Sequence, residues 1–426
     1  RGRFGEPRSQ RGGQVEPVLP PDLGWSARCS DVARNFEWPP SPVCDGGIGA
    51  FEAFLHSCKA KQLVSRIKRC LGAGLSGWRG EALLCLRLLP EGDDDRARRV
   101  PVLRRFIVAC AQGRLSALER ALRGYKLTPL KKKNPTKVRP IGCGEPLVKL
   151  VDNAWLAYLR GSAALRKRLR PYQYASNLKS GLESLGVSLA LDIAKAPGNK
   201  VVKRDAVNFF NRLCRSFLIC AAFAIDAAFG QYVQVKLSVR TEYTWFTSTE
   251  ESGFRTFATL LGTVQGGSLG FLLGSLATAD PLRAWAAVMR SVAGLEVPGH
   301  ESLADLEADP SFHPAVLAAA RKWLVDNDTE FQRFSSIIAA QGSSPPTSSR
   351  GFADDQTTHV HPAGVELAES LQDVLFEPTG AVFGGEREVL SPAEDGEGGM
   401  VVAGQPLWAA QIIDRDSDGA ICFGLG

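Results

Sequence analysis

The sequence predicts an α+β fold, because long segments with helical spacing alternate with a few short extended runs. In the long segments, apolar residues recur every three to four positions, as on the buried face of a helix. The extended runs are bounded by turn-like residues, which is typical of strands that pair in hairpins. Together these patterns favour a sheet of short strands with helices packed against it.

The composition is that of an ordinary globular protein of 426 residues, of which 44% are hydrophobic and 23% charged. This length allows two or three domains, or one large enzyme with several lobes. The ten cysteines include no Cys-x-x-Cys pair, and most lie in apolar stretches. They indicate reduced residues in an intracellular reducing compartment, either the nucleus or a mitochondrion. No run of 18 apolar residues occurs, so we expect no membrane span.

The first part of the chain is expected to be an arm followed by helices and one hairpin. Residues 1–47 are rich in Gly, Pro and Arg, which predicts a flexible arm; since the first residue is not Met, we expect a processed chain or a fragment. Helical spacing covers 48–72, 100–124 and 145–170. Between the last two, in residues 124–142, extended runs flank KKNPTK, which predicts a β-hairpin with a basic tip.

The second part is expected to alternate strands and helices. NKVVKRD, residues 199–205, reads as a short strand ending in an aspartate, and one helix should follow it. Residues 263–291 predict a glycine-rich turn and then a long helix. Residues 294–350 contain one helical piece and a disordered-looking stretch, QGSSPPTSSRG. RGFADDQTTHV, residues 350–360, places two aspartates between extended runs, as in a hairpin turn.

Basic residues are clustered, although the net charge is only +6. One cluster covers the predicted hairpin tip and the other follows the helical segment: Lys131, Lys132, Lys133, Lys137 and Arg139, then Arg166, Lys167, Arg168 and Arg170. Clusters of this kind indicate a polyanionic partner. Either cluster alone is equally compatible with a solvated surface.

Three aspartates carry the chemical prediction. Asp354 and Asp355 are adjacent, and neighbouring carboxylates repel each other unless water or a cation screens them. Asp205 ends a strand, so the three carboxylates would meet at one sheet edge if that strand pairs beside the hairpin. Such a cluster suits two Mg²⁺ ions about 3.5–4 Å apart, which can activate an attacking 3′-hydroxyl and stabilise a leaving pyrophosphate. The alternative for an isolated Asp-Asp pair is a surface turn.

Seven segments, in chain order, resemble the reverse transcriptases of non-long-terminal-repeat retrotransposons. LTPLKKKNPTKVRPIGCGEPLVKLV resembles the fingers segment with its Arg-Pro-Ile-x-x-Gly-Glu core, and PYQYASNLKSGLESL the segment after it. The palm motifs resemble DAVNFFNRL, TVQGGSLGFLLGSLA, FADD and TGAVFGGEREVLSP, and AICFGLG resembles the start of the primer grip. A match to one segment alone is weak evidence for the family, whereas seven matches in the family's order are specific.

The resemblance implies an RNA-directed DNA polymerase with right-hand fingers and palm, whose antiparallel palm sheet has helices on one face. Fingers with N-terminal helices would occupy 48–198 and the palm 199–426, with an insertion at 294–350 and no thumb. The partners would be an RNA template, a primer strand and deoxynucleoside triphosphates. The cofactor would be two Mg²⁺ ions.

The resemblance also implies residue roles. Asp205 and Asp354 would bind both metal ions, with support from Asp355, and Phe210 would stack under the incoming sugar and exclude a 2′-hydroxyl. Further residues would line the nucleotide pocket or hold template and triphosphate charge: Gln265, Gly266, Arg139 and a lysine of the 131–133 run. A core aromatic is the alternative for Phe210.

Several positions depart from the family's pattern. Phe209 stands where an alanine is usual, Gly267-Ser268 where Asp-Pro is usual, and Phe271 where proline is usual; Arg387 replaces a lysine. The altered second palm motif, the insertion at 294–350 and the missing thumb favour a second hypothesis, a domesticated relative that binds RNA as a structural subunit of a ribonucleoprotein such as an organellar ribosome, alongside other proteins.

Two metal-like patterns have simpler explanations. DRDSDG, residues 414–419, matches half of a calcium loop, but Leu425 stands where a glutamate would close it, so a hairpin turn is favoured. His359 and His361 lack a third ligand in the sequence nearby and are interpreted as ordinary strand residues.

Overall fold

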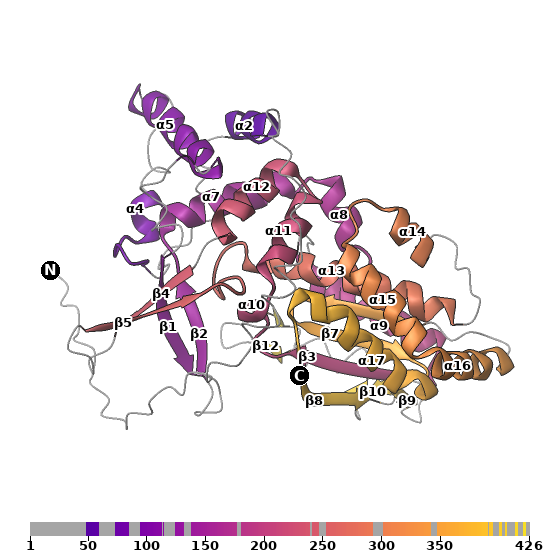
Figure 1. Cartoon of the computed structure of the whole chain (residues 1–426). Coiled ribbons are helices and arrows are strands. Elements are labelled where there is room, and N and C mark those ends of the chain that lie inside the picture. The colour runs from indigo at the N-terminus through magenta and orange to yellow at the C-terminus, as the bar shows by residue number, and fades with distance from the viewer. Residues whose placement is uncertain are drawn as a thin grey trace, which may run out of the picture.

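A computed structural model of the chain shows helices and strands in both halves (Figure 1). It describes these residues: 48–58, 73–84, 94–112, 114, 124–131, 138–176, 180–238, 241–246, 253–292, 301–341, 347–390, 392–394, 400–402, 405–406, 414–415 and 421–422. The expected arm at 1–47 therefore lies outside the described residues. The α+β class is confirmed.

Two four-stranded sheets organise the fold. Sheet A has the strand order β2-β1-β4-β5 and is mixed, since β1 pairs parallel to β4 and the other pairs are antiparallel. Its strands are β1 Gly124–Lys131, β2 Val138–Cys143, β4 Thr241–Phe246 and β5 Phe254–Thr259. The predicted hairpin at 124–142 is confirmed as β1 and β2, whereas the tip at 132–137 lies outside the described residues.

Sheet B is antiparallel throughout, with the order β6-β7-β3-β8. Its strands are β3 Lys200–Ala206, β6 Ser348–Phe352, β7 Asp355–Val360 and β8 Phe383–Leu390. The predicted strand at 199–205 and the hairpin around FADD are therefore confirmed. Shorter strands follow further along the chain. A three-stranded sheet with the order β11-β10-β9 contains β9 Pro392–Glu394, β10 Met400–Val402 and β11 Gln405–Pro406, and a two-stranded sheet contains β12 Asp414–Arg415 and β13 Ile421–Cys422.

Of the helices in the first half of the chain, those up to α7 lie above sheet A in Figure 1, whereas α9 lies farther right, beside sheet B. Their bounds are α2 Ile48–Ser57, α4 Gly80–Leu84, α5 Asp94–Ala111, α7 Pro146–Leu159, α8 Ala163–Leu169 and α9 Gly181–Lys195. The helical prediction for 145–170 holds for 146–159 and 163–169. The helix breaks at 160–162, where the Ser162 hydroxyl accepts a hydrogen bond from the Leu165 N–H and caps the start of α8.

The segment after β3 is three helices, not the single helix predicted. They are α10 Phe209–Arg212, α11 Arg215–Phe223 and α12 Ala227–Leu237. The first break arises because Cys214 N–H donates to the Thr379 carbonyl, outside the helix. At the second break, the Asp226 side chain accepts from the Phe229 N–H and caps α12.

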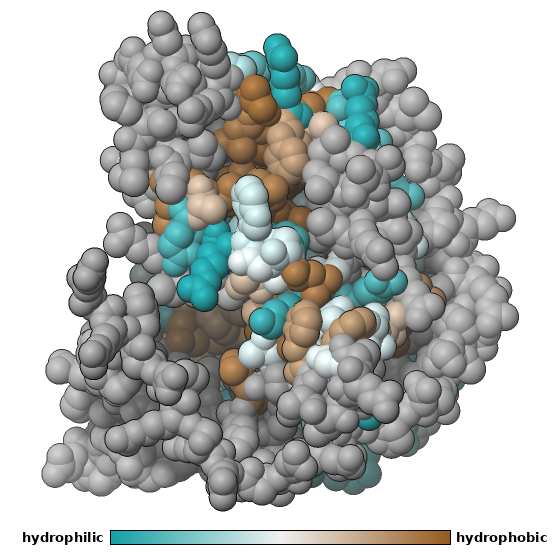
Figure 2. Space-filling view, turned by 90° about the vertical axis from the view of Figure 1, so that its left-hand side faces the viewer, coloured by the Kyte–Doolittle hydropathy of each residue, from teal (hydrophilic) through white to brown (hydrophobic). Residues whose placement is uncertain are grey.

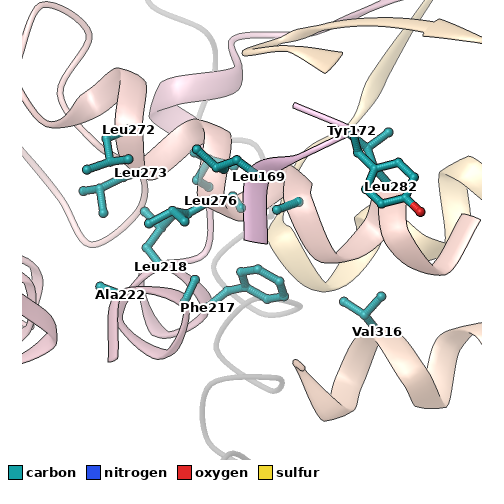
Figure 3. Close-up of a cluster of buried hydrophobic side chains, with 14 of the residues drawn as sticks. Leu169, Tyr172, Phe217, Leu218, Ala222, Leu272, Leu273, Leu276, Leu282 and Val316 are labelled. Carbon is teal, nitrogen blue, oxygen red and sulfur yellow. The ribbon is translucent and has the colours of Figure 1, made fainter. Parts of the chain in front are cut away.

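Helix α13, Gly270–Ser291, confirms the predicted glycine-rich turn and long helix, and it forms the centre of the core. Nearly all of its side chains are buried. Figure 3 shows Leu272, Leu273 and Leu276 of α13 beside Phe217 and Leu218 of α11. Because α13 also contacts α8, α15, α17 and β6, it joins the two parts of the chain that hold the candidate site.

The region expected to be an insertion, 294–350, packs into the main core. It contains α14 Leu303–Ala308, α15 Pro314–Asp326 and α16 Asp328–Ala340. After β7, the chain continues with the 3-10 turn η3 Pro362–Gly364, helix α17 Val365–Phe376 and the 3-10 turn η4 Glu377–Thr379. Trp323, Phe331 and Phe334 are buried. The expected disorder is wrong at 348–351, which belong to β6, because these residues pair with β7.

Helices cover both faces of sheet B, unlike the one-faced arrangement expected. On one face, Arg204 of β3 donates to Asp373 of α17 at 2.7 Å and to the Gln372 side chain at 3.2 Å. On the other face, Val201 packs against Leu189 and Ile193 of α9. The end of β3 beyond α9, where Asp205 is exposed, is the part of this second face that concerns the candidate site.

None of the helices in the described ranges is long and apolar enough to cross a membrane.

Candidate active site

Asp205, Asp354 and Asp355 meet at one end of sheet B. Asp205 of β3 is the direct register partner of Asp355 of β7, so the two side chains lie on the same face of the sheet. The Ala206 N–H donates to the Asp354 carbonyl at 3.3 Å. The sequence predicted this convergence from a strand that ends in an acid and a hairpin that turns on two, and the antiparallel register confirms it.

The crowding of these carboxylates appears in the protonation of Asp355. Burial, followed by the charges of Asp354 and Asp205, raises its pKa from 3.8 to about 6, and only Lys203 opposes the shift. A like-charged cluster of this kind favours a bound proton or a bound cation. Carboxylate oxygens are the donors that Mg²⁺ prefers.

The donor chemistry of the three aspartates therefore fits divalent cations. Within the described part of the chain, no three or more His, Cys, Asp or Glu side chains are grouped so that they could hold a metal ion.

The turn that carries Asp354 is strained and is held by buried amides. Ala353 has φ of 57°, in the left-handed region that non-glycine residues rarely adopt. The fully buried Gln173 side chain accepts from the Ala353 N–H at 3.1 Å, and Gln356 donates to the Ala353 carbonyl at 3.2 Å. A side chain at Gly351 would collide with both amides. This conformation fixes where Asp354 is presented.

Gln173 also connects this turn to the core helix. Its amide nitrogen donates to the Thr278 hydroxyl of α13 at 2.6 Å, while its oxygen additionally accepts from the Tyr174 N–H. The backbone of Gln173 pairs parallel to Gly351, extending sheet B by one short bridge. Gln173 belongs to the Gln-Tyr pair of a family-like segment, but no role was predicted for it, because its burial is visible only in the structure.

A row of aromatic rings adjoins the carboxylates. The Phe210 ring of α10 stacks on Phe271 of α13, with centroids 6.3 Å apart, and Phe271 meets Phe352 of β6 edge-on at 5.9 Å. Phe352 immediately precedes the Ala353-Asp354 turn. Phe209 is buried and lies edge-on to Phe210 at 5.2 Å. Its bulk, where alanine was expected, is accommodated by Gly274, whose added Cβ would lie 2.8 Å from the Phe209 ring.

The loop before α13 joins this row to sheet A. Thr263 N–H donates to the Phe210 carbonyl at 2.6 Å, and Gly142 N–H of β2 donates to the Gln265 carbonyl at 2.8 Å. Gly266 has φ of 95° and lies against Ile141 and Gly142, so a larger residue there would be strained and crowded. This loop therefore places Gln265 and Gly266 beside β2, while its residue Thr263 contacts Phe210 of α10.

The basic residues of the first cluster are placed only in part. Arg139 pairs with Leu130 in the β1–β2 ladder and Lys131 with Val138, and their side chains are outside what the structure describes. Lys132, Lys133 and Lys137 lie outside the described residues altogether. Arg139 is three residues from Gly142, on the strand that contacts Gln265.

In the second basic cluster, on and just after α8, three side chains are exposed and one is buried. Arg166, Lys167 and Arg170 are exposed, as an RNA-binding surface requires. Arg168 is buried instead: its guanidinium pairs with Asp280 of α13 at 2.5 Å and donates to the Ser311 carbonyl at 2.7 Å. The expectation that Arg168 contacts RNA is therefore wrong, because this side chain is used to join helices α8 and α13.

The remaining candidates have structural environments of their own. Arg387 of β8 forms an ion pair with Glu369 of α17. His359 is buried, whereas the His361 ring accepts from the Ala363 N–H and contacts the Gln341 side chain. β12 and β13 pair antiparallel around DRDSDG, as the hairpin-turn interpretation expects.

Comparisons with known proteins give no family. No family model matches the chain, and no curated protein sequence is significantly similar to it. The function of the protein is therefore inferred from the arrangement of the three aspartates and from the motif resemblance.

Proposed function

We propose that this protein is an RNA-directed DNA polymerase that extends a primer by nucleotidyl transfer at Asp205, Asp354 and Asp355. The observation that carries the proposal is the in-register pairing of Asp205 with Asp355, beside the turn that presents Asp354. Three carboxylates at one strand end are costly unless something offsets their repulsion. The RNA template and the deoxynucleotide substrates come from the motif resemblance.

In this proposal Asp205 and Asp354 hold two Mg²⁺ ions, and Asp355 supports them. When bound, these ions supply activation of the primer 3′-hydroxyl and stabilisation of the leaving pyrophosphate. The chain supplies the position: β3 fixes Asp205, and the turn clamped by Gln173 and Gln356 fixes Asp354. With a pKa of about 6, Asp355 is largely ionised at neutral pH and can bind a cation.

The pocket for the incoming nucleotide is assigned to the loop and ring that adjoin this cluster. Phe210 would lie under the sugar, and Gln265 and Gly266 would contact the nucleotide where the backbone approaches β2 most closely. Arg139, on that same strand, would hold negative charge of the template or triphosphate. The exposed bases of α8, Arg166, Lys167 and Arg170, would contact RNA phosphates.

A second candidate is an RNA-binding structural subunit of a ribonucleoprotein. The observation that favours it is the altered segment that leads into α13, where Gly267-Ser268 in the loop and Phe271 in the first turn of the helix replace the residues usual in reverse transcriptases. Such a protein would bind RNA through its basic residues without catalysis at the three aspartates.

Primer extension on an RNA template separates the two candidates. With Mg²⁺ and deoxynucleoside triphosphates, the wild-type chain should extend the primer, and Asp354→Asn should reduce extension by about a thousandfold or more, because it removes a charged metal ligand. Asp326→Asn, an exposed acid at the end of α15, is the matched control and should extend normally. RNA binding without extension by the wild-type chain would favour the structural subunit.

A further inference from the structure

Phe271 is an exposed aromatic residue in contact with the proposed sugar-binding ring. It lies in the first turn of α13, and 42% of its surface is accessible. Its ring is nearly parallel to that of Phe210, at 22°, and nearly perpendicular to that of Phe352, at 73°. A ring that served only to fill the core would be buried like its neighbour Phe209.

The Phe210 ring is held by its neighbour Phe209 and by two positions of α13, Gly274 and Phe271. Phe209 packs edge-on against Phe210, and the Gly274 backbone comes so close that an added Cβ would lie 3.1 Å from the Phe210 ring. Phe271 stacks on it from α13. An offset-stacked pair restricts how far either ring can tilt.

We infer that Phe271 is a positioning residue for substrate selection: it locks the Phe210 ring and so strengthens the rejection of nucleotides that carry a 2′-hydroxyl. This inference rests on the proposed function. A ring that can tilt yields space to the hydroxyl, whereas a ring held by its neighbours does not. Proline, the residue usual at this position in the resembled family, has no aromatic ring to stack in this way.

The same contact reaches the metal-binding turn. Phe352, which meets Phe271 edge-on, directly precedes Ala353 and Asp354. A change at Phe271 should therefore alter the choice between sugars most, and the rate with the correct nucleotide less, because two buried amides hold the turn independently.

The test is single-nucleotide incorporation with a deoxynucleotide and with the matching ribonucleotide, each as kcat/KM. In Phe271→Ala the preference for the deoxynucleotide should fall about three- to tenfold, the range expected for losing one aromatic pair. Phe271→Tyr should keep the preference, and so should the control Phe254→Ala, which truncates an exposed ring on β5.

Three outcomes are decisive. A lowered preference in Phe271→Ala with near-normal deoxynucleotide incorporation supports the inference. An unchanged preference, in a variant whose thermal melting shows that it is folded, overturns it and leaves the proposed function intact; if Phe271→Ala does not fold, Phe271→Leu is judged by the same criterion. Absence of incorporation by the wild-type chain overturns the proposed function and this inference with it.

Discussion

Asp355 should make the metal-free protein less stable as the pH rises. Its pKa in the fold is about 6, against 3.8 ordinarily. Between these values the folded chain keeps a proton that the unfolded chain releases, so the free energy of unfolding falls with rising pH. The extra stability is complete below about pH 4 and lost as the pH passes about 6. A shift of about two pKa units corresponds to about 3 kcal/mol. Since Asp355 is partly exposed, screening reduces this to about 1–2 kcal/mol.

Urea unfolding in EDTA at several pH values between 4 and 7 measures this effect. Other acids titrate in the same range, so the comparison is with Asp355→Asn, which lacks the titrating group. From pH 4 to pH 7 the wild-type chain should lose about 1–2 kcal/mol more than the variant. Mg²⁺ should restore more stability at pH 7 than at pH 5, because the ionised cluster binds it. Parallel pH profiles of the two chains would refute the account of crowded carboxylates.

Two further variants test the surroundings of the site. Ala353→Gly should keep the free energy of unfolding or raise it by up to about 1 kcal/mol, because glycine adopts φ of 57° without strain. The control Ala318→Gly, at an exposed position inside α15, should lower the free energy of unfolding by about 1 kcal/mol. An equal loss in both variants would show that the turn is unstrained. Arg168→Ala should cost about 2–4 kcal/mol, since it takes a partner from buried Asp280, whereas exposed Arg166→Ala should change stability by less than about 0.5 kcal/mol. Equal effects of the two arginine variants on unfolding would contradict the buried ion pair.

Local patterns predicted the strands of the site because turn residues and β-branched runs act over short distances. The hairpin around FADD and the strand before Asp205 followed from such runs, and their pairing followed from the assumption that the three acids share a function. The sequence could not tell Arg168 from its neighbours Arg166 and Lys167, since all three are basic residues within one helical turn. Only the position of Asp280, 112 residues away, decides which of them is buried.

Tertiary contacts also decided where helices break and what the region 294–350 does. The break between α10 and α11 depends on a hydrogen bond from Cys214 to Thr379, which no local pattern announces. The Ser-Pro-rich stretch before FADD looked disordered, yet its last residues form β6 because they pair with the neighbouring strand β7. The motif resemblance indicated the candidate pocket residues. Only the structure showed that Gln173 contacts the turn that carries Asp354 and that Phe271 contacts the Phe210 ring.

Templated primer extension by the wild-type chain, beside Asp354→Asn, tests the central claim most directly. On an RNA template with Mg²⁺ present, the account predicts that the wild-type chain adds the deoxynucleotide complementary to the template base, and that the variant adds almost none. Incorporation that is independent of the template base, or equal incorporation by both chains, would contradict the claim that Asp205, Asp354 and Asp355 form a polymerase active site.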